Sequence, residues 1–231
     1  MKYETEQMLG STRIPFSPLK VPSQRRAWVT YNSVLDATAR LLETTGFAAL
    51  TTNHVADLAG VSIGSLYEYF PDKETLVAEL ARRTLREIMG EVTGGLRDAV
   101  ELGGEPGLRR GVGILFEVVE RRRALVRELW QLPYLATLDE FKQLPKVTVE
   151  ITRQLSPAFA KKRVLRNLEA SSWLLTVMVG NAVVHGAAAR PRTLARKDVE
   201  DTLVQMLALL LLPARPRKGA ARRLVSSQDK I

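Results

Sequence analysis

The chain offers few side chains that could act as a nucleophile, a general base or a metal ligand. It contains no cysteine and two histidines, His54 and His185. Its carboxylates are scattered along helical patterns, and neither a Ser/His/Asp arrangement nor a glycine-rich phosphate loop nor a metal-ligand spacing stands out. We therefore expect no catalytic residue, no metal and no cofactor, and we interpret His54 as a surface or cap residue. The lack of cysteine excludes a disulfide framework and suits a reducing compartment.

Several side chains that can form hydrogen bonds lie between Thr51 and Lys73. Hydroxyl and ammonium groups can donate to phosphate oxygens. The small residues Gly64 and Ser65 let the backbone come close to a partner. This chemistry is that of contact with DNA, provided that the surrounding elements supply the geometry.

Two short helices joined by a glycine turn are predicted across this segment. The first covers Thr52–Ala59 and stops at Gly60, and the second covers Ile63–Phe70, with Ser62 as its N-cap and Pro71 after its end. Such a pair is a helix-turn-helix, whose second helix enters the major groove of DNA. The residues expected on its apolar side are Val55, Leu58, Val61, Leu66 and Phe70.

The outward face of the second helix follows from its apolar side. Leu66 and Phe70 are four residues apart and therefore face inward together. Residues two positions from Leu66, which are Gly64 and Glu68, lie about 200° away around the helix. The residues that flank this outward face are Ile63 and Tyr67 on one side and Ser65 and Tyr69 on the other.

A longer helix is predicted on each side of this pair. The first runs from Gln24 to about Glu43, with Ser23 as its N-cap and Gly46 as its end. The other starts at Lys73, behind the N-cap Asp72, and continues into the nineties. The buried stripe expected for the first helix consists of Trp28, Tyr31, Leu35, Thr38 and Leu42, widened by Val34 and Leu41.

The segment from Gln24 to about Arg83 resembles the TetR family of regulators. The matching motifs are Gly46-Phe47, Thr51-Thr52, Val55-Ala56, Gly60-Val61-Ser62, the run from Gly64 to Phe70 and the run from Asp72 to Leu76. The resemblance covers about a quarter of the chain by motif and the rest by helical layout only. It implies a cytoplasmic homodimer that binds a palindromic operator in double-stranded DNA, often as a repressor, and releases it when a small molecule enters the body.

The resemblance also implies which residues contact DNA. It assigns phosphate contacts to Thr52, Ser65, Tyr67, Tyr69 and Lys73, and base-edge positions to Asn53 and Ile63, while Ser62 and Gly64 complete the set at the start of the second helix. One departure from the family pattern is that the helix offers no Arg, Lys, Asn or Gln to the groove, and Glu68 is acidic. Specificity then depends on Asn53, on Arg25 and Arg26 beside the duplex, and on DNA shape.

Each of these residues also has a simpler interpretation. Tyr67 and Tyr69 could be core aromatics, Lys73 a solvated residue at a helix start, and Asn53 a support for the helix N-terminus. The inward pairing of Leu66 and Phe70 favours exposure of both tyrosines.

The net charge of +9 does not locate the DNA-binding face. Residues 24–84 carry six Lys and Arg against seven Asp and Glu, whereas residues 190–231 carry ten against four. We expect a flexible arm at residues 1–23, the helix-turn-helix domain at 24–84, a helical ligand-binding and dimerisation domain at 85–212, and a disordered basic tail at 213–231.

The expected fold class is all-α, with a three-helix N-terminal domain and about nine helices in all. Loops are predicted at Gly94-Gly95 and at residues 103–107, and the predicted body helices span 107–121, 123–131, 138–154, 163–189 and 197–212. The stretch from Ala170 to Ala189 has no charged residue and is long enough to span a membrane. Its serines, its glycines and His185 favour a buried helix, and the membrane reading is kept as the alternative.

The body is expected to hold a small apolar effector and to form the dimer. The candidate ligand residues are Phe116, Trp130, Tyr134, Phe141, Trp173, Met178, Asn181 and His185, each of which could equally be core. The candidate dimer stripes are Leu168, Ser172, Leu175, Val179, Ala182 and Gly186 in one helix and Val199, Leu203, Met206 and Leu210 in the next. Both stripes could instead belong to the monomer core.

Two other functions are compatible with this sequence. One is a helix-turn-helix regulator that is controlled by a protein partner, or an architectural DNA binder, without a small-molecule ligand. The other is an enzyme that uses a helical fold. Ligand-dependent loss of operator binding separates the first from an effector-released repressor, and a turnover assay separates the second.

Overall fold

The computed structural model describes residues 16–155, 168–188, 190 and 192–212, and every regular element within them is a helix. The all-α prediction is therefore confirmed. In chain order the elements are α1 (Arg25–Ala49), α2 (Thr52–Ala59), α3 (Ile63–Tyr67), α4 (Lys73–Leu102), α5 (Gly104–Arg121), α6 (Arg123–Trp130), the short 3-10 helix η1 (Leu135–Thr137), α7 (Asp139–Lys142), α8 (Leu144–Leu155), α10 (Leu168–Ala188) and α11 (Arg196–Leu211). The predicted basic tail at 213–231 and the first fifteen residues lie outside the described residues.

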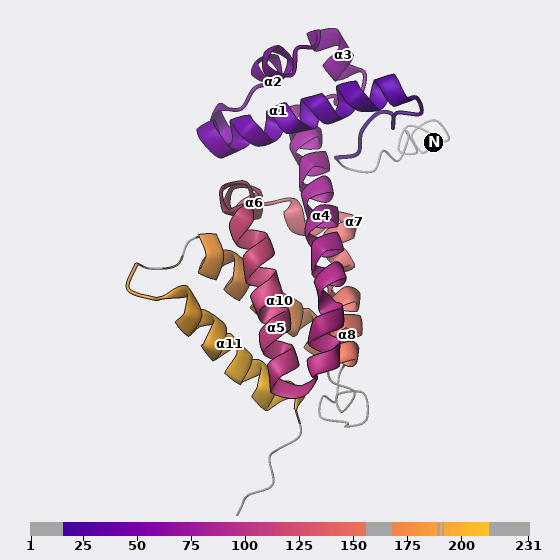
Figure 1. The fold of residues 1–231 in the computed structure, drawn as a ribbon. Coiled ribbons are helices and arrows are strands. Elements are labelled where there is room, and N and C mark those ends of the chain that lie inside the picture. Colours follow the sequence, from indigo (N-terminus) through magenta and orange to yellow (C-terminus); the bar gives the residue numbers. More distant parts are fainter. Residues whose placement is uncertain (1–15, 156–167, 189, 191, 213–231) are drawn as a thin grey trace, which may run out of the picture.

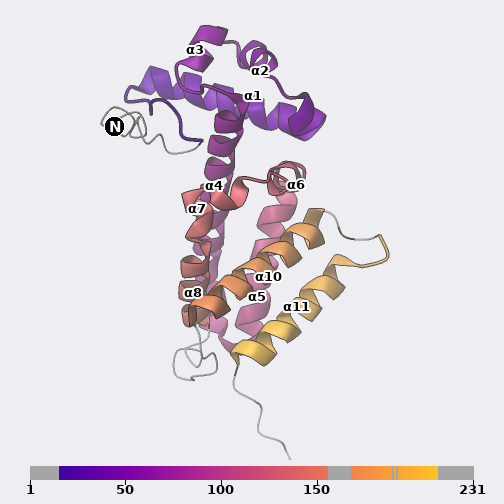
Figure 2. The same cartoon turned by 180° about the vertical axis from the view of Figure 1, so that it is seen from behind.

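The molecule has a small head and a larger body that share one long helix (Figures 1 and 2). In the head, α1 lies across the first turns of α4, and α2 and α3 lie on the outer side of α1. In the body, α5 and α8 run along α4, while α10 and α11 form the side that Figure 2 brings to the front. Two hydrophobic cores result, one centred on the head and one on the body.

Local chemistry fixes the turn after α2 and the starts of α3 and α4 as predicted. Gly60 has φ 68° and ψ 33°, a left-handed conformation that glycine adopts without a steric penalty. The Ser62 side chain accepts a hydrogen bond from the Ser65 amide at 3.0 Å, and the Asp72 carboxylate accepts one from the Thr75 amide at 2.6 Å. The predicted caps of α3 and α4 are therefore confirmed.

The limits and the buried side of α1 differ from the prediction. Gln24, not Ser23, stands at its N-cap, without a side-chain cap bond. Gly46 breaks the helix with φ 73° and ψ 171°, but one more turn follows to Ala49. Trp28 was expected in the buried stripe and is 40% exposed; the helices that pack on α1 are α2, α4 and α6.

Two further predictions about the helix-turn-helix are wrong. α3 ends at Tyr67 rather than Phe70, since the chain turns just before Pro71, which cannot continue a helix. Leu58 was expected on the apolar side and is 48% exposed, because Val55 and Ala56 face the core from α2. Leu66 and Phe70 are fully buried, as their spacing predicts.

The predicted loop at Gly94-Gly95 does not exist, since both glycines lie inside α4. The apolar positions Val92, Leu96 and Ala99 continue across them and pack against α5. A Cβ built on Gly95 would lie 3.0 Å from the Ile114 side chain, so glycine permits this close approach. Packing on α5 outweighs the cost of about 1 kcal/mol that a glycine imposes on a helix interior.

The loop predicted at residues 103–107 is reduced to the turn at Gly103, whose φ is 58°. Conversely, the single helix predicted over 138–154 is divided into α7 and α8 at Gln143, with Pro145 in the first turn of α8. Proline is tolerated there because the first-turn amides have no partner within the helix.

Residues 16–23 were expected to belong to a flexible arm, but they pack against the head. The Leu19 amide donates to the Tyr69 carbonyl at 2.8 Å, and Phe16 stacks on Tyr134. No helix of the part that the structure describes is both long enough and apolar enough to cross a membrane.

The crossing of α4 and α5 gives a stability prediction. A Cβ built on Gly107 would collide with the Ala99 carbonyl oxygen, so we expect Gly107→Ala to lower the free energy of unfolding by about 1–3 kcal/mol. Gly113 lies in the same helix with nothing within 4 Å of its Cβ position. Gly113→Ala should instead raise the free energy of unfolding by about 1 kcal/mol. Urea denaturation of both variants is the measurement, and equal effects would contradict the close approach.

Candidate nucleic-acid interface and an internal cavity

The outer surface of α2 and α3 exposes most of the residues expected to contact DNA. Asn53, Ser62 and Gly64 are exposed, Ile63 is 37% exposed and Tyr67 is 43% exposed. Thr52 and Ser65 are partly exposed on the same two helices. This surface lies at the end of the molecule farthest from the body (Figure 1).

Hydroxyl groups on this surface hold one another in place. The Thr52 Oγ1 and the Tyr67 hydroxyl oxygen lie 3.0 Å apart, which joins the start of α2 to the end of α3. The Ser62 and Ser65 hydroxyls lie 2.8 Å apart. Each hydroxyl has more hydrogen-bonding capacity than one such bond uses, so each can still meet a phosphate oxygen.

Tyr69 is not on this surface, contrary to the sequence prediction. It is 7% exposed, and its ring packs edge-on against Tyr31 with centroids 5.5 Å apart. Because α3 ends at Tyr67, the helical spacing that predicted an outward Tyr69 no longer applies there. Tyr69 belongs to the core of the head.

Some charged residues of the head are exposed, and others contact neighbouring groups of the chain. Arg25 and Arg26 are exposed in the first turn of α1. The Lys73 ammonium donates to the Phe47 carbonyl at 3.3 Å and lies 4.6 Å from the centre of the Phe47 ring. The bond to the carbonyl uses one of the three N–H donors of the ammonium group, so Lys73 can also donate to a phosphate. Glu68 forms an ion pair with Lys20 at 2.5 Å, and this hydrogen bond raises the pKa of the Lys20 ammonium.

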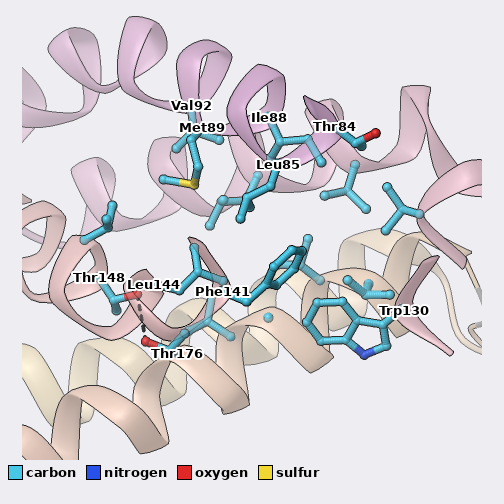
Figure 3. A pocket seen from close by; sticks show the side chains of 18 of the residues that line it. Thr84, Leu85, Ile88, Met89, Val92, Trp130, Phe141, Leu144, Thr148 and Thr176 are labelled. Carbon is cyan, nitrogen blue, oxygen red and sulfur yellow. Dashed lines mark hydrogen bonds between the residues drawn. The ribbon is translucent and has the colours of Figure 1, made fainter. Parts of the chain in front are cut away.

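A cavity of about 230 Å³, partly open to solvent, lies in the body (Figure 3). Its walls come from α4, α5, α6, η1, α7, α8 and α10. Its walls are mostly aliphatic, and the polar side chains among them are those of Thr84, Thr148, Thr152 and Thr176. No charged side chain lines it among the described residues. The Thr176 and Thr148 hydroxyls lie 2.9 Å apart at one wall. The cavity thus suits an uncharged apolar molecule that carries few polar atoms.

The structure brings only two of the eight predicted ligand residues to this cavity, Trp130 and Phe141. Phe116 is fully buried in the body core against Gly186, and Trp173 is 56% exposed. The other four predicted residues that lie outside the lining are Tyr134, Met178, Asn181 and His185. Asn181 instead accepts a hydrogen bond from the Trp130 indole at 3.3 Å.

Sequence reasoning missed the walls from α4 and α8. The α4 wall includes Leu85, Ile88, Met89 and Val92, and the α8 wall includes Leu144, Val147, Thr148 and Ile151. Their spacing of three and four residues marks one face of each helix, which was the available signal.

Tyr134 lies outside the cavity, between the head and the body. Its ring stacks on Phe16 with centroids 4.5 Å apart and meets the edge of Phe47 at 6.5 Å. Its hydroxyl oxygen is buried without a hydrogen-bond partner among the described residues. Burial and the nearby carboxylates of Glu74 and Asp72 raise the pKa of this phenol.

Most of the stripe predicted for the dimer faces the core of its own chain. Ser172, Leu175 and Leu203 are buried, and Val179 lines the cavity. A Cβ built on Gly186 would lie 2.7 Å from the Phe116 ring. Ala182 and Val199 are partly buried against the body core, and the Leu168 side chain lies outside the description.

Apolar side chains are nevertheless exposed on the opposite faces of these two helices. On α10 the exposed residues are Trp173, Leu174 and Val177, and on α11 they are Met206, Leu209 and Leu210. Met206 and Leu210 belong to the predicted stripe. These residues form a surface that we call the α10–α11 face. Nothing in the described chain covers it.

No group of three or more His, Asp or Glu side chains in the described part of the chain is arranged to hold a metal ion.

Known proteins resemble this chain both in sequence and in fold. Residues 34–80 match the family model described as bacterial regulatory proteins, tetR family. The chain is 40% identical over 58 residues to the HTH-type transcriptional repressor KstR2 of Rhodococcus jostii, an alignment that covers 25% of this chain and 28% of that protein. It is 31% identical over 132 residues to KstR2 of Mycobacterium tuberculosis, covering 52% of this chain and 64% of that protein. The alignments therefore span less than two thirds of these relatives.

One solved structure of similar fold is that of AibR in complex with isovaleryl coenzyme A and operator DNA. The TM-score is 0.53 at 19% identity, and the superposition covers 80% of this chain and 99% of AibR. At this identity the likeness concerns the fold alone.

The head and the layout of the body agree with these matches. The capped α2–turn–α3 unit with Gly60 in the left-handed conformation lies within residues 34–80, and the helical body follows through a shared α4. Residues 34–80 therefore form a DNA-binding head of the bacterial tetR regulatory-protein type, and the helical layout of the whole described chain is that of solved TetR-family structures.

Proposed function

We propose that this protein is a transcriptional repressor that binds a two-fold symmetric DNA operator as a homodimer and releases it when a small apolar molecule occupies the body cavity. The observation that carries the proposal is the surface of α2 and α3, where Asn53, Ile63 and Tyr67 are exposed while Leu66 and Phe70 are fully buried. The relatives named as repressors support the direction of regulation.

The proposed contacts divide into two kinds. Thr52, Ser65, Tyr67 and Lys73 meet phosphates, which position the head without reading sequence. Asn53 and Ile63 read base edges, and the exposed Gly64 lets the α3 backbone approach the groove. Tyr69 is not among the proposed contacts, because its ring is buried.

The cavity favours regulation of DNA binding by a small molecule rather than by a protein partner alone. Its aliphatic walls and paired threonine hydroxyls offer dispersion contacts and a few hydrogen bonds but no countercharge. The AibR complex holds isovaleryl coenzyme A. In this chain, the part of any effector that enters the cavity is proposed to be uncharged.

The α10–α11 face supports dimerisation. A helix such as α10, which is apolar on both faces, requires cover on both. The body core covers one face, and a second copy of the chain is proposed to cover the other, so that two heads meet the two halves of one operator.

The experiment that tests the function is selection of duplexes from random sequence with the full chain, followed by gel shift of the selected duplex. We expect a two-fold symmetric sequence bound by two subunits or a multiple of two. A monomer bound to one asymmetric half-site would contradict the proposal. Specific binding that no small molecule alters would favour the partner-controlled or architectural alternative.

Leu209 provides the test of the dimer. It is 85% exposed in the single chain, so Leu209→Glu should leave the fold intact while placing two carboxylates in the apolar interface. We expect sedimentation to show monomers and the gel shift to weaken. Leu102→Glu, at a 58% exposed leucine at the end of α4, is the matched control and should remain dimeric.

The two kinds of DNA contact respond differently to substitution. Lys73→Ala should weaken binding to all duplexes alike and lower the salt slope by about one unit, because one phosphate contact is lost. Asn53→Ala should cost about 1–3 kcal/mol at one base pair and relax the preference there. Lys142→Ala, at an exposed lysine of α7 paired with Asp139, is the control and should change neither quantity. An unchanged slope in a folded Lys73→Ala protein would remove Lys73 from the interface.

The cavity gives a prediction about ligand charge. We expect neutral 1-octanol to bind more tightly than octanoate at neutral pH, by more than about tenfold, because the walls have no cation to pair with a carboxylate. Trp130, which lines the cavity, is the fluorescent reporter, and Trp130→Phe is the control for signal from Trp28 and Trp173. For a molecule that releases DNA, the operator must weaken its binding by the same factor. Tighter binding of the anion would be evidence against an uncharged effector.

A further inference from the structure

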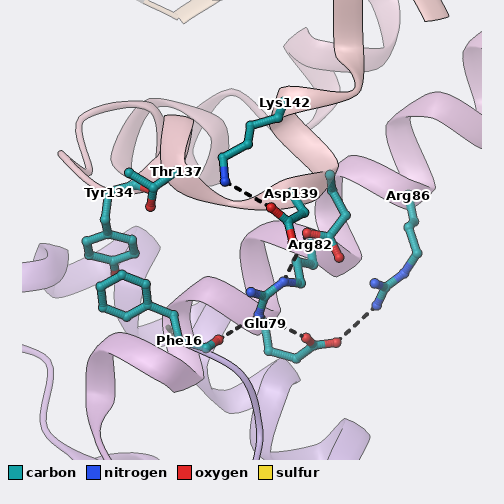
Figure 4. A network of polar contacts seen from close by, with 9 residues as sticks. Phe16, Glu79, Arg82, Arg86, Tyr134, Thr137, Asp139 and Lys142 are labelled. Carbon is teal, nitrogen blue, oxygen red and sulfur yellow. Dashed lines mark hydrogen bonds and ion pairs between the residues drawn. The ribbon is translucent and has the colours of Figure 1, made fainter. Parts of the chain in front are cut away.

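A short N-terminal segment connects α3, which is the proposed reading helix, to the body. We call Phe16–Lys20 the strap. At its first residue, the Phe16 ring stacks on Tyr134 and the Phe16 carbonyl accepts a hydrogen bond from the Arg82 guanidinium at 2.7 Å (Figure 4). This end of the strap therefore contacts the loop between α6 and α7 and the middle of α4.

The other end of the strap holds the end of α3. The Leu19 amide donates to the Tyr69 carbonyl at 2.8 Å. The Lys20 ammonium pairs with Glu68 at 2.5 Å and lies 4.9 Å from the centre of the Tyr69 ring. Lys20 thus neutralises the carboxylate of Glu68, which would otherwise repel the DNA phosphates from the end of the reading helix.

The loop that receives the strap is also a wall of the cavity. Leu135 and Phe141 line the cavity, while their neighbours Tyr134 and Glu140 contact Phe16 and Arg82 respectively. Side chains of adjacent residues therefore touch the cavity on one side and the strap or its anchor on the other.

Arg82 makes the connection tight. It is 7% exposed, and its guanidinium donates to Glu140 at 3.1 Å as well as to the Phe16 carbonyl, with Glu79 3.5 Å away (Figure 4). Removing one partner of a buried guanidinium strongly lowers the stability of the protein. A displacement of α7 that moves Glu140 away from Arg82 should therefore also disturb the hydrogen bond between Arg82 and the Phe16 carbonyl. Phe16 also has φ 59°, a strained value for a residue other than glycine, which such contacts must maintain.

We propose that the strap positions the end of α3 for DNA binding and carries the state of the cavity to it, with Phe16 and Lys20 as its positioning residues. This proposal rests on the proposed function. A molecule that displaces Leu135 or Phe141 moves Tyr134 and Glu140, and the stacking and hydrogen bonds at Phe16 are lost. The strap then no longer fixes the end of α3 or neutralises Glu68, and affinity for DNA falls.

The first arm of the test uses the selected duplex and needs no ligand. We expect Phe16→Ala to weaken duplex binding by on the order of fivefold and to lower the salt slope by less than the unit or so expected for Lys73→Ala, because no phosphate contact is removed and only the neutralisation of Glu68 is lost. Phe16→Tyr keeps a stacking ring and should bind as the wild type does. Leu19→Ala, which keeps the amide donor and replaces a 54% exposed side chain, is the matched control.

The second arm measures hydrogen exchange of the Leu19 amide, which reports whether the strap is in place. The probe for the cavity is the neutral fluorophore N-phenyl-1-naphthylamine. In the wild type we expect the duplex to slow this exchange and the bound probe to accelerate it, while the probe lowers duplex affinity by about fivefold or more. In Phe16→Ala the exchange should be fast throughout, and the effect of the probe on duplex affinity should shrink towards none.

The outcomes separate this proposal from the proposed function. A folded Phe16→Ala protein with wild-type Leu19 exchange, duplex affinity and response to the probe would overturn the role of the strap and leave the repressor intact. The same conclusion follows if the bound probe lowers duplex affinity without changing Leu19 exchange. A wild-type protein that selects no duplex would instead refute the proposed function itself.

Discussion

Helix α4 belongs to both hydrophobic cores, and the rest of the molecule is organised around that constraint. Leu76 and Leu80 are buried in the head, and Val92 and Leu96 are buried in the body, all on one continuous helix. At about 1.5 Å per residue its 30 residues extend for roughly 45 Å without a flexible linker. The head core also continues into α6 and the following loop, so the head cannot reorient without disturbing walls of the cavity.

Short-range chemistry accounts for what the sequence predicted well. The bounds of α2, the left-handed Gly60 and the caps Ser62 and Asp72 all depend on neighbours within four residues. The backbone itself determines where these helices begin and end, because a cap side chain accepts a hydrogen bond from a free amide and glycine alone tolerates the turn without strain. The same reasoning failed at Gly94-Gly95, where packing between α4 and α5 overrides a local preference against helix.

Periodicity identifies a face of a helix but not what covers it. In α10 apolar residues occur all round, so the stripe of small residues through Ser172 and Gly186 could have met either a partner or the chain's own core. The structure puts that stripe inward, where Gly186 admits the Phe116 ring, and leaves Trp173 and Leu174 outside. The cavity posed the same difficulty, since its walls come from six α-helices and η1, which only the tertiary fold brings together.

The acidic balance of the head, which argued against DNA binding by charge alone, has a structural explanation. Asp36 pairs with Arg83 at 2.9 Å, Glu79 faces two arginines, Asp72 caps α4 and Glu68 pairs with Lys20. These carboxylates serve the internal structure of the head, and each has a cation or an amide beside it that offsets its field. What a phosphate meets is therefore set by the groups exposed on α2 and α3 rather than by the sum of charges. Lys20 lies outside residues 24–84, so a count over that segment includes Glu68 and omits its partner.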